Sequence, residues 1–291
     1  MNDCLEQKQN FGLSVCVRIP QMPRCMITTP ANFKFTAAQM ASEATFKAAV
    51  EAAIAAGAAE RIYLWPLFSG FENASEAAVY EENAYGSMFV RNGRYRFRFF
   101  FTQDLCLHTA MYSHRATSGR AFVLDIDDQM LGTKDSEGNF YGFTISLVNP
   151  ENLVISDGSV STKSPVYVVL ANPIELNKNG RLVPASFINT IERLTSVTLA
   201  DGPAPDSATK VQVNVNNECD STPLEGLAKE DFKLLTTAGA PQTITTITYV
   251  GNGLYELNGT GLVSGTVDLV AAADLSVKNY ESSGPKTVTI T

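Results

Sequence analysis

The chain has 291 residues, more than one typical domain, and 45% of them are hydrophobic and 18% charged, which excludes a disordered or collagen-like protein. Its formal net charge of −8 argues against a general nucleic-acid-binding function, because affinity for phosphate depends on lysine and arginine. No apolar run reaches the ~18 residues that a membrane-spanning helix needs. The first residues lack the features of a signal peptide, so we expect a protein that folds in a cytoplasm.

The clearest regular element that we expect is a helix over residues 37–56. Thr36 and Gln39 match a capping box, in which the two side chains satisfy backbone N–H groups at the start of a helix. The residues that follow are rich in alanine, the best helix former. Larger apolar residues recur at the spacing of a single helical face: Phe46, Val50, Ala53 and Ile54. The pattern predicts a helix that covers one face of a β-sheet.

A long segment with little regular periodicity follows this helix, over residues 65–93. Loops of this length are unusual inside a compact domain and tend to be functional. We therefore expect residues 65–93 to form a loop that reaches a neighbouring subunit.

The next segment carries the sharpest local pattern in the chain, three arginines that alternate with aromatic residues: Arg94-Tyr95-Arg96-Phe97-Arg98-Phe99. In a strand the aromatic residues share one face, which we expect in the core, and the arginines share the other. Three like charges ~7 Å apart repel one another unless something opposes them. One interpretation pairs Arg94, Arg96 and Arg98 with carboxylates of the same chain or of an adjoining subunit. The candidates lie in the preceding segment: Glu72, Glu76, Glu81 and Glu82.

A second interpretation brings the three arginines into contact with nucleic acid. The acidic composition and the lack of accompanying lysines favour the carboxylate pairing.

The remainder of the chain is typical of β-structure. Residues 120–126, 140–147 and 165–170 are rich in strand-forming residues. Beyond Arg193 the composition changes, and Gly, Asn, Pro and Asp separate seven short strand-like segments: 195–199, 210–215, 232–235, 244–250, 254–257, 265–270 and 286–290. That spacing predicts an immunoglobulin-like sandwich. The expected fold is mainly β, with a β-sandwich or barrel and one flanking helix in residues 1–192 and an immunoglobulin-like domain in residues 193–291.

No catalytic or cofactor motif is recognisable, neither a Gly-x-Ser-x-Gly turn nor a phosphate-binding loop, dinucleotide fingerprint or His-Glu-x-x-His pair. Cys106 and His108 lack further metal ligands at suitable spacing, and Asp125-Ile-Asp127-Asp128 lacks the Gly and Glu of a calcium loop. A hydrolase would have to be built from few groups: Asp104, His108 and Ser113. We therefore expect no enzymatic activity, no metal and no cofactor. The five irregularly spaced cysteines are expected to be free thiols.

Several segments resemble virion structural proteins of phages and prophages of Bacteroides-type gut bacteria, in particular tail-tube-like proteins. They run from Arg61-Ile-Tyr-Leu-Trp-Pro-Leu-Phe-Ser-Gly-Phe-Glu72 through Val90-Arg-Asn-Gly-Arg-Tyr-Arg96 to Asp157-Gly-Ser-Val-Ser-Thr-Lys163, and the resemblance covers about residues 10–185. It implies a sandwich or barrel whose subunits join their sheets into a ring, commonly hexameric. Such rings would stack into a tube around a lumen for DNA, with residues 65–93 as the contact between subunits or rings.

The resemblance also implies partners and a location. The partners would be other copies of the chain, other virion proteins and DNA that passes transiently and non-specifically, with no membrane. The protein would be assembled in the bacterial host cytoplasm and reside in the virion, with residues 193–291 as an outward decoration.

Two alternatives remain open at the level of sequence. A head–tail collar or a capsid-associated virion protein is also compatible with the resemblance. A module that binds glycans or a cell surface would use aromatic residues of the second domain: Tyr249, Tyr255 and Tyr280.

Overall fold

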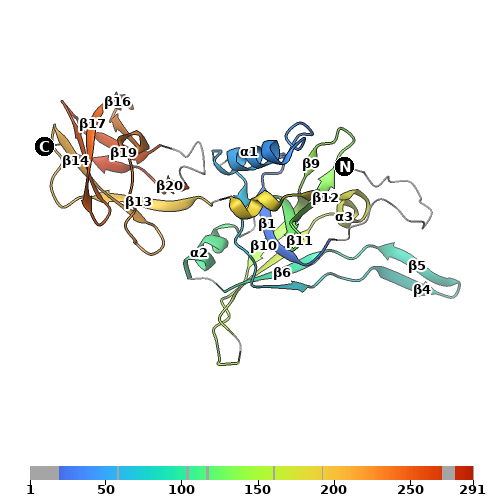
Figure 1. Cartoon of the computed structure of the whole chain (residues 1–291). Coiled ribbons are helices and arrows are strands. Elements are labelled where there is room, and N and C mark those ends of the chain that lie inside the picture. Colours follow the sequence, from blue (N-terminus) through green and yellow to red (C-terminus); the bar gives the residue numbers. More distant parts are fainter. Residues whose placement is uncertain are drawn as a thin grey trace. The chain divides into compact units, whose positions relative to one another are not determined.

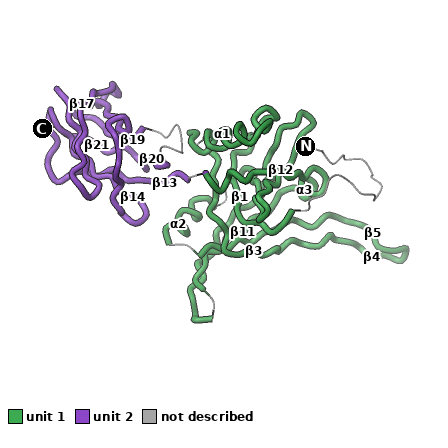
Figure 2. The backbone as a smooth tube through the Cα atoms, viewed as in Figure 1, with its two compact units in different colours: residues 1–190 green, residues 191–291 purple. Residues whose placement is uncertain are grey.

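The computed structural model describes residues 20–57, 59–102, 105–115, 118–159, 161–191, 193–270 and 279–290. The protein is mainly β and divides into two compact units, Met1–Thr190 and Ile191–Thr291 (Figure 2). The sequence predicted the boundary at residues 192 and 193.

The first unit is built on one ten-stranded sheet (Figure 1). Its strands are β1 (Pro23–Thr29), β2 (Tyr63–Leu64), β3 (Gly70–Asn73), β6 (Arg96–Phe101), β7 (Gly119–Asp125), β8 (Gln129–Lys134), β9 (Phe140–Tyr141), β10 (Phe143–Pro150), β11 (Ser164–Leu170) and β12 (Gly180–Pro184). The main path runs β12-β8-β7-β10-β11-β6-β3, while β1 pairs with both β2 and β7, and β9 pairs with β8. All pairings are antiparallel.

The stretch from β2 to β3 connects the two sides of this sheet. The Trp65 N–H donates to the Met26 carbonyl of β1 at 2.9 Å, and the Phe68 N–H donates to the Arg24 carbonyl at 2.8 Å. Two residues after Phe68, the chain pairs with β6 as β3. Backbone hydrogen bonds therefore run from β1 through β7, β10, β11, β6 and β3 back to β1. The circuit does not close the whole sheet, because the main path still ends at β12.

One core cluster of the first unit takes its residues from β1, β6, β7, β10 and β11, from the helix that contains Met111 and from the stretch between β2 and β3. It comprises Met26, Trp65, Phe99, Phe101, Met111, Ala121, Ile145, Val148, Val166 and Val168. Trp65 is 2% exposed, and its indole N–H donates to Thr28 Oγ1 at 3.0 Å. The core therefore satisfies the polar group of its largest side chain.

The first helix is shorter than expected. Helix α1 spans Glu43–Ile54, whereas the sequence predicted residues 37–56. Thr36 and Gln39 do exchange the hydrogen bonds of a capping box, but they close a turn that precedes the helix. The N-cap is Ser42, whose side chain accepts the N–H of the third helical residue. Two capping signals lie six residues apart, and the second one starts the helix.

The buried face of α1 agrees with the predicted stripe, because Phe46, Val50, Ala53 and Ile54 are all buried. The expectation of a single flanking helix is incomplete. The described residues include two further helices in this unit, α2 (Leu105–Ser113) and α3 (Pro173–Asn179). Both are short, and each presents at most one buried residue, so neither produces a clear helical period in the sequence.

The second unit has two sheets. One contains β13 (Thr195–Asp201), β14 (Lys210–Asn217), β17 (Ile244–Gly251), β18 (Leu254–Gly259) and β20 (Tyr280–Ser282), in the order β17-β18-β14-β13-β20. The other contains β15 (Phe232–Thr236), β16 (Pro241–Gln242), β19 (Gly265–Leu269) and β21 (Lys286–Val288), in the order β16-β15-β19-β21. Each of the seven predicted strand segments overlaps one of these strands, and β16 and β20 were not predicted. Both sheets contribute to one core, with Val213 and Leu257 from the first and Leu234 and Val267 from the second.

His114 lies directly after α2, and from its surroundings we predict that the free energy of unfolding depends on pH. Its ring lies 4.8 Å from the ring of Tyr63 and 6.0 Å from that of Trp65, and burial lowers its pKa below the usual value of 6.5. The unfolded chain therefore binds this proton more readily than the folded one. We expect the resulting stability to be complete above about pH 6.5 and to be lost as the pH falls through the lower pKa of the folded state.

Urea unfolding at pH 7.5 and at pH 5.5 measures this effect, with His114→Phe as the comparison. The substitution should reduce the loss of stability on acidification. An equal loss in both proteins would show that His114 is not responsible.

Candidate assembly surface

The segment expected to be a long loop contains regular structure. Besides β3, residues 65–93 contain β4 (Val79–Asn83) and β5 (Gly86–Arg91), which form a two-stranded antiparallel sheet. In the first unit this ribbon projects beyond the other strands (Figure 1). We call residues 79–91 the arm. The sequence showed no strand alternation here because every residue of β4 and β5 is exposed, so neither face is selected to be apolar.

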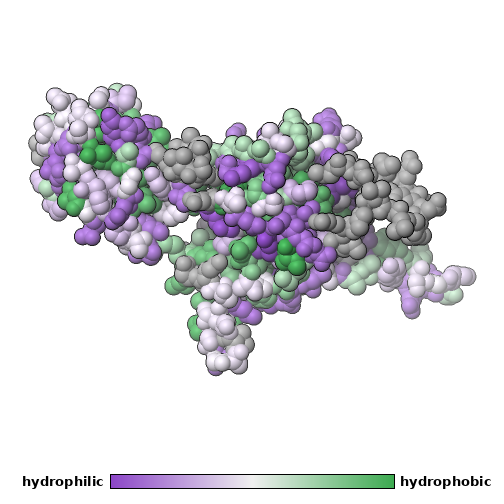
Figure 3. All heavy atoms as spheres, in the orientation of Figure 1, coloured by the Kyte–Doolittle hydropathy of each residue, from purple (hydrophilic) through white to green (hydrophobic). Residues whose placement is uncertain are grey.

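Large apolar side chains are exposed along the arm. Tyr80 and Met88 are each 60% exposed, Phe89 is 56% exposed, and the rings of Tyr80 and Phe89 form an edge-to-face pair at 5.9 Å. The others are Val79, Tyr85 and Val90. The visible face of this region shows hydrophobic and hydrophilic residues side by side (Figure 3). Contiguous exposed apolar surface on a folded protein typically marks an interaction site, and an isolated two-stranded ribbon is at best marginally stable in water.

The arm joins the sheet through a tightly packed connection, which we call the neck: residues 74–76 on one strand and 93–96 on the other. The Ala74 N–H donates to the Arg96 carbonyl, and the Glu76 N–H donates to the Arg94 carbonyl, both at 3.0 Å. A Cβ atom on Gly93 would lie 1.9 Å from the Glu76 carbonyl oxygen, so only glycine fits there. The ribbon therefore continues from the sheet into the arm.

Glu76 holds the two strands of the neck together electrostatically. Its carboxylate pairs with Arg91 at 3.3 Å and also with Arg96. Burial alone would raise the pKa of Glu76, but the hydrogen bond from Arg91 and the charges of both arginines hold that pKa below its ordinary value. The carboxylate thus stays ionised, and its two ion pairs link the outgoing strand of the neck to the returning one.

Arg98 is paired within the chain as well. Its guanidinium group donates to the Glu151 carboxylate at 2.7 Å. It also lies 3.5 Å from the carboxylate of Glu72, the residue of β3 that pairs with Arg98. Burial alone would lower the pKa of Arg98, but these two carboxylates raise it. The sequence did not predict the pairing with Glu151, because this residue lies 53 residues away in the chain and belongs to no recognisable motif.

The structure thus divides the seven predicted interface residues into two groups. Arg96, Arg98, Glu72 and Glu76 form ion pairs inside the chain. The other three are exposed and have no ion-pair partner in the part of the chain that the structure describes: Arg94, Glu81 and Glu82. The alternation of the arginine strand agrees with the prediction at Phe99, which is fully buried in the core.

Two of the groups considered for hydrolysis or metal binding, His108 and Asp125, form hydrogen bonds within the fold. His108 Nδ1 lies 2.7 Å from Ser164 Oγ, and Asp104 lies outside the described residues. Among the described residues, no group of three or more His, Cys, Asp or Glu side chains could hold a metal ion. The Asp125 carboxylate accepts hydrogen bonds from the backbone N–H groups of Asp127 and Gln129, which fixes a turn. It also accepts one from the backbone N–H of Gln21.

Two cysteines differ from the expectation of free thiols. Cys106 and Cys219 are disulfide-bonded, whereas Cys25 is free and buried. Cys4 and Cys16 lie outside the described residues. The irregular spacing of the cysteines gave no sign of a disulfide, because pairing depends on positions in the fold.

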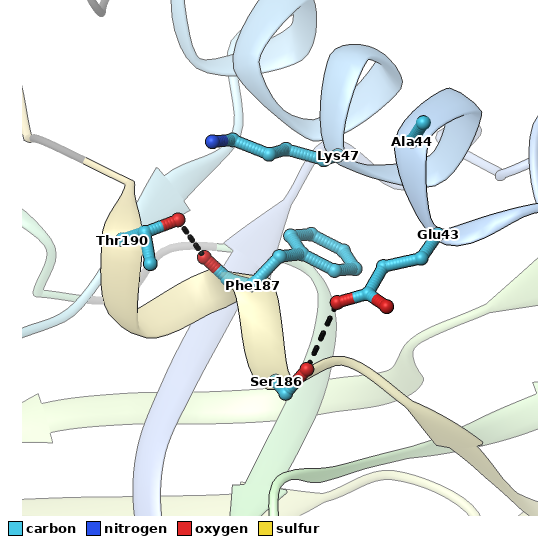
Figure 4. Close-up of a pocket in the computed structure, with 6 residues that line it drawn as sticks. All are labelled: Glu43, Ala44, Lys47, Ser186, Phe187 and Thr190. Carbon is cyan, nitrogen blue, oxygen red and sulfur yellow. Dashed lines mark hydrogen bonds between the residues drawn. The ribbon is translucent and has the colours of Figure 1, made fainter.

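A shallow hollow lies between α1 and the 3₁₀ helix Ser186–Thr190 (Figure 4). Ser186 Oγ donates to Glu43 at 2.9 Å, and Thr190 Oγ1 donates to the Phe187 carbonyl at 2.8 Å. These polar groups bind one another and do not converge on a common point, as the groups of a catalytic site would.

No family model matches the chain, and no curated protein matches its sequence. No helix among the described residues is long and apolar enough to span a membrane.

The aromatic residues considered for glycan binding are mostly covered. Tyr255 is fully buried, and Tyr280 is partly buried against the core of the second unit. Tyr249 is 39% exposed, and its hydroxyl donates to Glu225 at 2.7 Å. Of the three tyrosines, one therefore offers an exposed ring.

Proposed function

We propose that the protein is a structural subunit that assembles with copies of itself. The arm carries this proposal, because its two strands and their turn expose six large apolar side chains on a ribbon that the neck connects to the sheet. Burial of apolar surface is the main driving force of protein association. A two-stranded ribbon is marginally stable on its own, so docking against another copy would also stabilise the arm.

We further propose that the assembly is part of a bacteriophage virion, and that the chain is a tail-tube subunit whose stacked rings surround a DNA conduit. The resemblance of residues 10–185 supports this, and so does the ring of hydrogen-bonded strands in the first unit. An acidic protein suits a lumen through which DNA slides, since it offers few cations to hold phosphates. The disulfide-bonded cysteines suit a particle that is released from the reducing cytoplasm of its host.

In this proposal the second unit is an immunoglobulin-like domain that decorates the assembly. Its two β-sheets with a shared core support such a sandwich. We expect a chain without residues 193–291 to assemble as the full chain does, because the arm belongs to the first unit. Sedimentation of both proteins over a range of concentrations measures this, and loss of assembly in the shortened chain would contradict the decorating role.

A head–tail collar or capsid-associated protein would use the same arm, and electron microscopy of the assembly distinguishes these from a tube. A glycan-binding or cell-surface module is the second candidate, supported only by the exposed ring of Tyr249. A glycan array with the full chain tests it, because a purely structural subunit should bind none of the glycans.

A further inference from the structure

Among the described residues, most charges at the base of the arm are paired within one chain, but three charges of the ribbon are not. Glu76 is shared by Arg91 and Arg96, and Arg98 is shared by Glu72 and Glu151. The charges that remain are exposed, with one positive group in the neck and two negative groups in the arm: Arg94, Glu81 and Glu82.

These remaining charges are too far apart to pair within one ribbon. Arg94 lies opposite Glu76, and Glu81 and Glu82 follow five and six residues further along the strand. At the rise of a β-strand the separation is roughly 15–20 Å. This exceeds the Debye length of about 8 Å at physiological ionic strength, so the charges of a single ribbon hardly interact. Each ribbon is thus positive at its neck and negative in its arm.

This polarity restricts how two ribbons can meet. Side by side in register, the arms would place carboxylates against carboxylates and arginines against arginines, which repel. If one ribbon is displaced along the other, the carboxylates of one arm reach the arginine of the other neck. The same contact would remove apolar side chains of the arm from water, either Tyr80 and Phe89 on one face of the ribbon or Met88 on the other.

We infer that the arm of one copy docks against the neck of the next copy, with one carboxylate of the arm facing Arg94, either Glu81 on one face of β4 or Glu82 on the other. This inference rests on the proposed self-assembly and identifies its contact. Two ribbons that run in the same direction and are displaced along each other make a heterologous contact, which repeats from copy to copy until it closes into a ring or extends as a filament. Two antiparallel ribbons would make the same contact reciprocally and close as a two-fold dimer, so the proposed ring requires the first arrangement. Charge complementarity of this kind fixes the register in which apolar surfaces pack.

A reciprocal charge reversal tests the contact in the full chain. Arg94→Glu alone, and Glu81→Arg with Glu82→Arg, should each weaken assembly at least roughly tenfold in sedimentation, because each places like charges together. The triple variant with all three changes restores opposite charges and should assemble within about threefold of the unaltered chain. The matched control reverses three exposed charges of the second unit and should leave assembly unchanged: Lys233→Glu, Glu218→Arg and Glu230→Arg.

Melting temperatures show whether each variant folds, and we expect no change, since all the altered side chains are exposed. Normal assembly of the Arg94→Glu and Glu81→Arg/Glu82→Arg variants would overturn the inference while leaving self-assembly intact. A folded triple variant that fails to recover would also overturn it. An unaltered chain that stays monomeric at all concentrations would overturn the proposed self-assembly as well.

Discussion

Replacing Asp206 by alanine should lower the free energy of unfolding of the second unit by about 3–5 kcal/mol, the usual cost of leaving a buried charge without its partner. The charge left behind belongs to Lys286 of β21, whose side chain is 4% exposed. Its ammonium group lies 3.2 Å from Asp206 Oδ2 and donates to the Gln212 carbonyl at 2.9 Å. The Asp206 side chain is 8% exposed and also accepts the Gln212 N–H at 2.9 Å. These bonds tie β21 to β14 and to the connection that precedes it.

Two comparisons isolate this effect in urea unfolding. Asp201 also lies 3.1 Å from the Lys286 ammonium group, but its side chain is 84% exposed, so Asp201→Ala should cost less than about 1 kcal/mol. The double variant Lys286→Met/Asp206→Ala removes both charges and should recover most of the stability that Asp206→Ala loses. Equal effects of Asp206→Ala and Asp201→Ala would show that the buried pair does not hold the unit together.

Serine in place of Tyr80, Met88 and Phe89 should nearly abolish assembly. Each side chain is more than half exposed in the single chain, so docking can bury this apolar surface. The burial contributes about 1–2 kcal/mol of binding free energy per residue. The sum for the three residues is at most about 3–6 kcal/mol, which corresponds to a roughly 100- to 20,000-fold weaker association. Sedimentation of the variant and of the unaltered chain measures the difference.

The matched control changes three exposed apolar residues outside the arm to serine: Ile155, Ile174 and Val263. It removes similar apolar surface and should assemble normally. If both variants lose assembly equally, the effect comes from general apolar surface and the arm has no special role.

Patterns between neighbouring residues predicted most of the strands and the buried helical face. Phe99 and Arg98 point to opposite faces of β6 because alternation is a local property of a strand, and Phe46 and Val50 share a face because helical spacing is local too. The start of α1 was misjudged because Thr36 and Ser42 both offer capping bonds, and only the position of the helix on the sheet decides between them.

The features that the sequence concealed depend on residues far apart in the chain. Arg98 meets Glu151 only because β11 folds back beside β6, and closure of the strand ring needs the Phe68 N–H to reach Arg24. The arm was predicted as a loop because a ribbon exposed on both faces has no reason to alternate. Apolar residues persist there without a core to bury them, and on this ground we propose an interaction surface.

The mass of the purified full chain in solution, followed by electron microscopy of the same sample, tests self-assembly most directly. The account predicts a mass of many copies and particles that are rings or hollow tubes. A single-chain mass at every concentration, with no ordered particles on the grid, would contradict it.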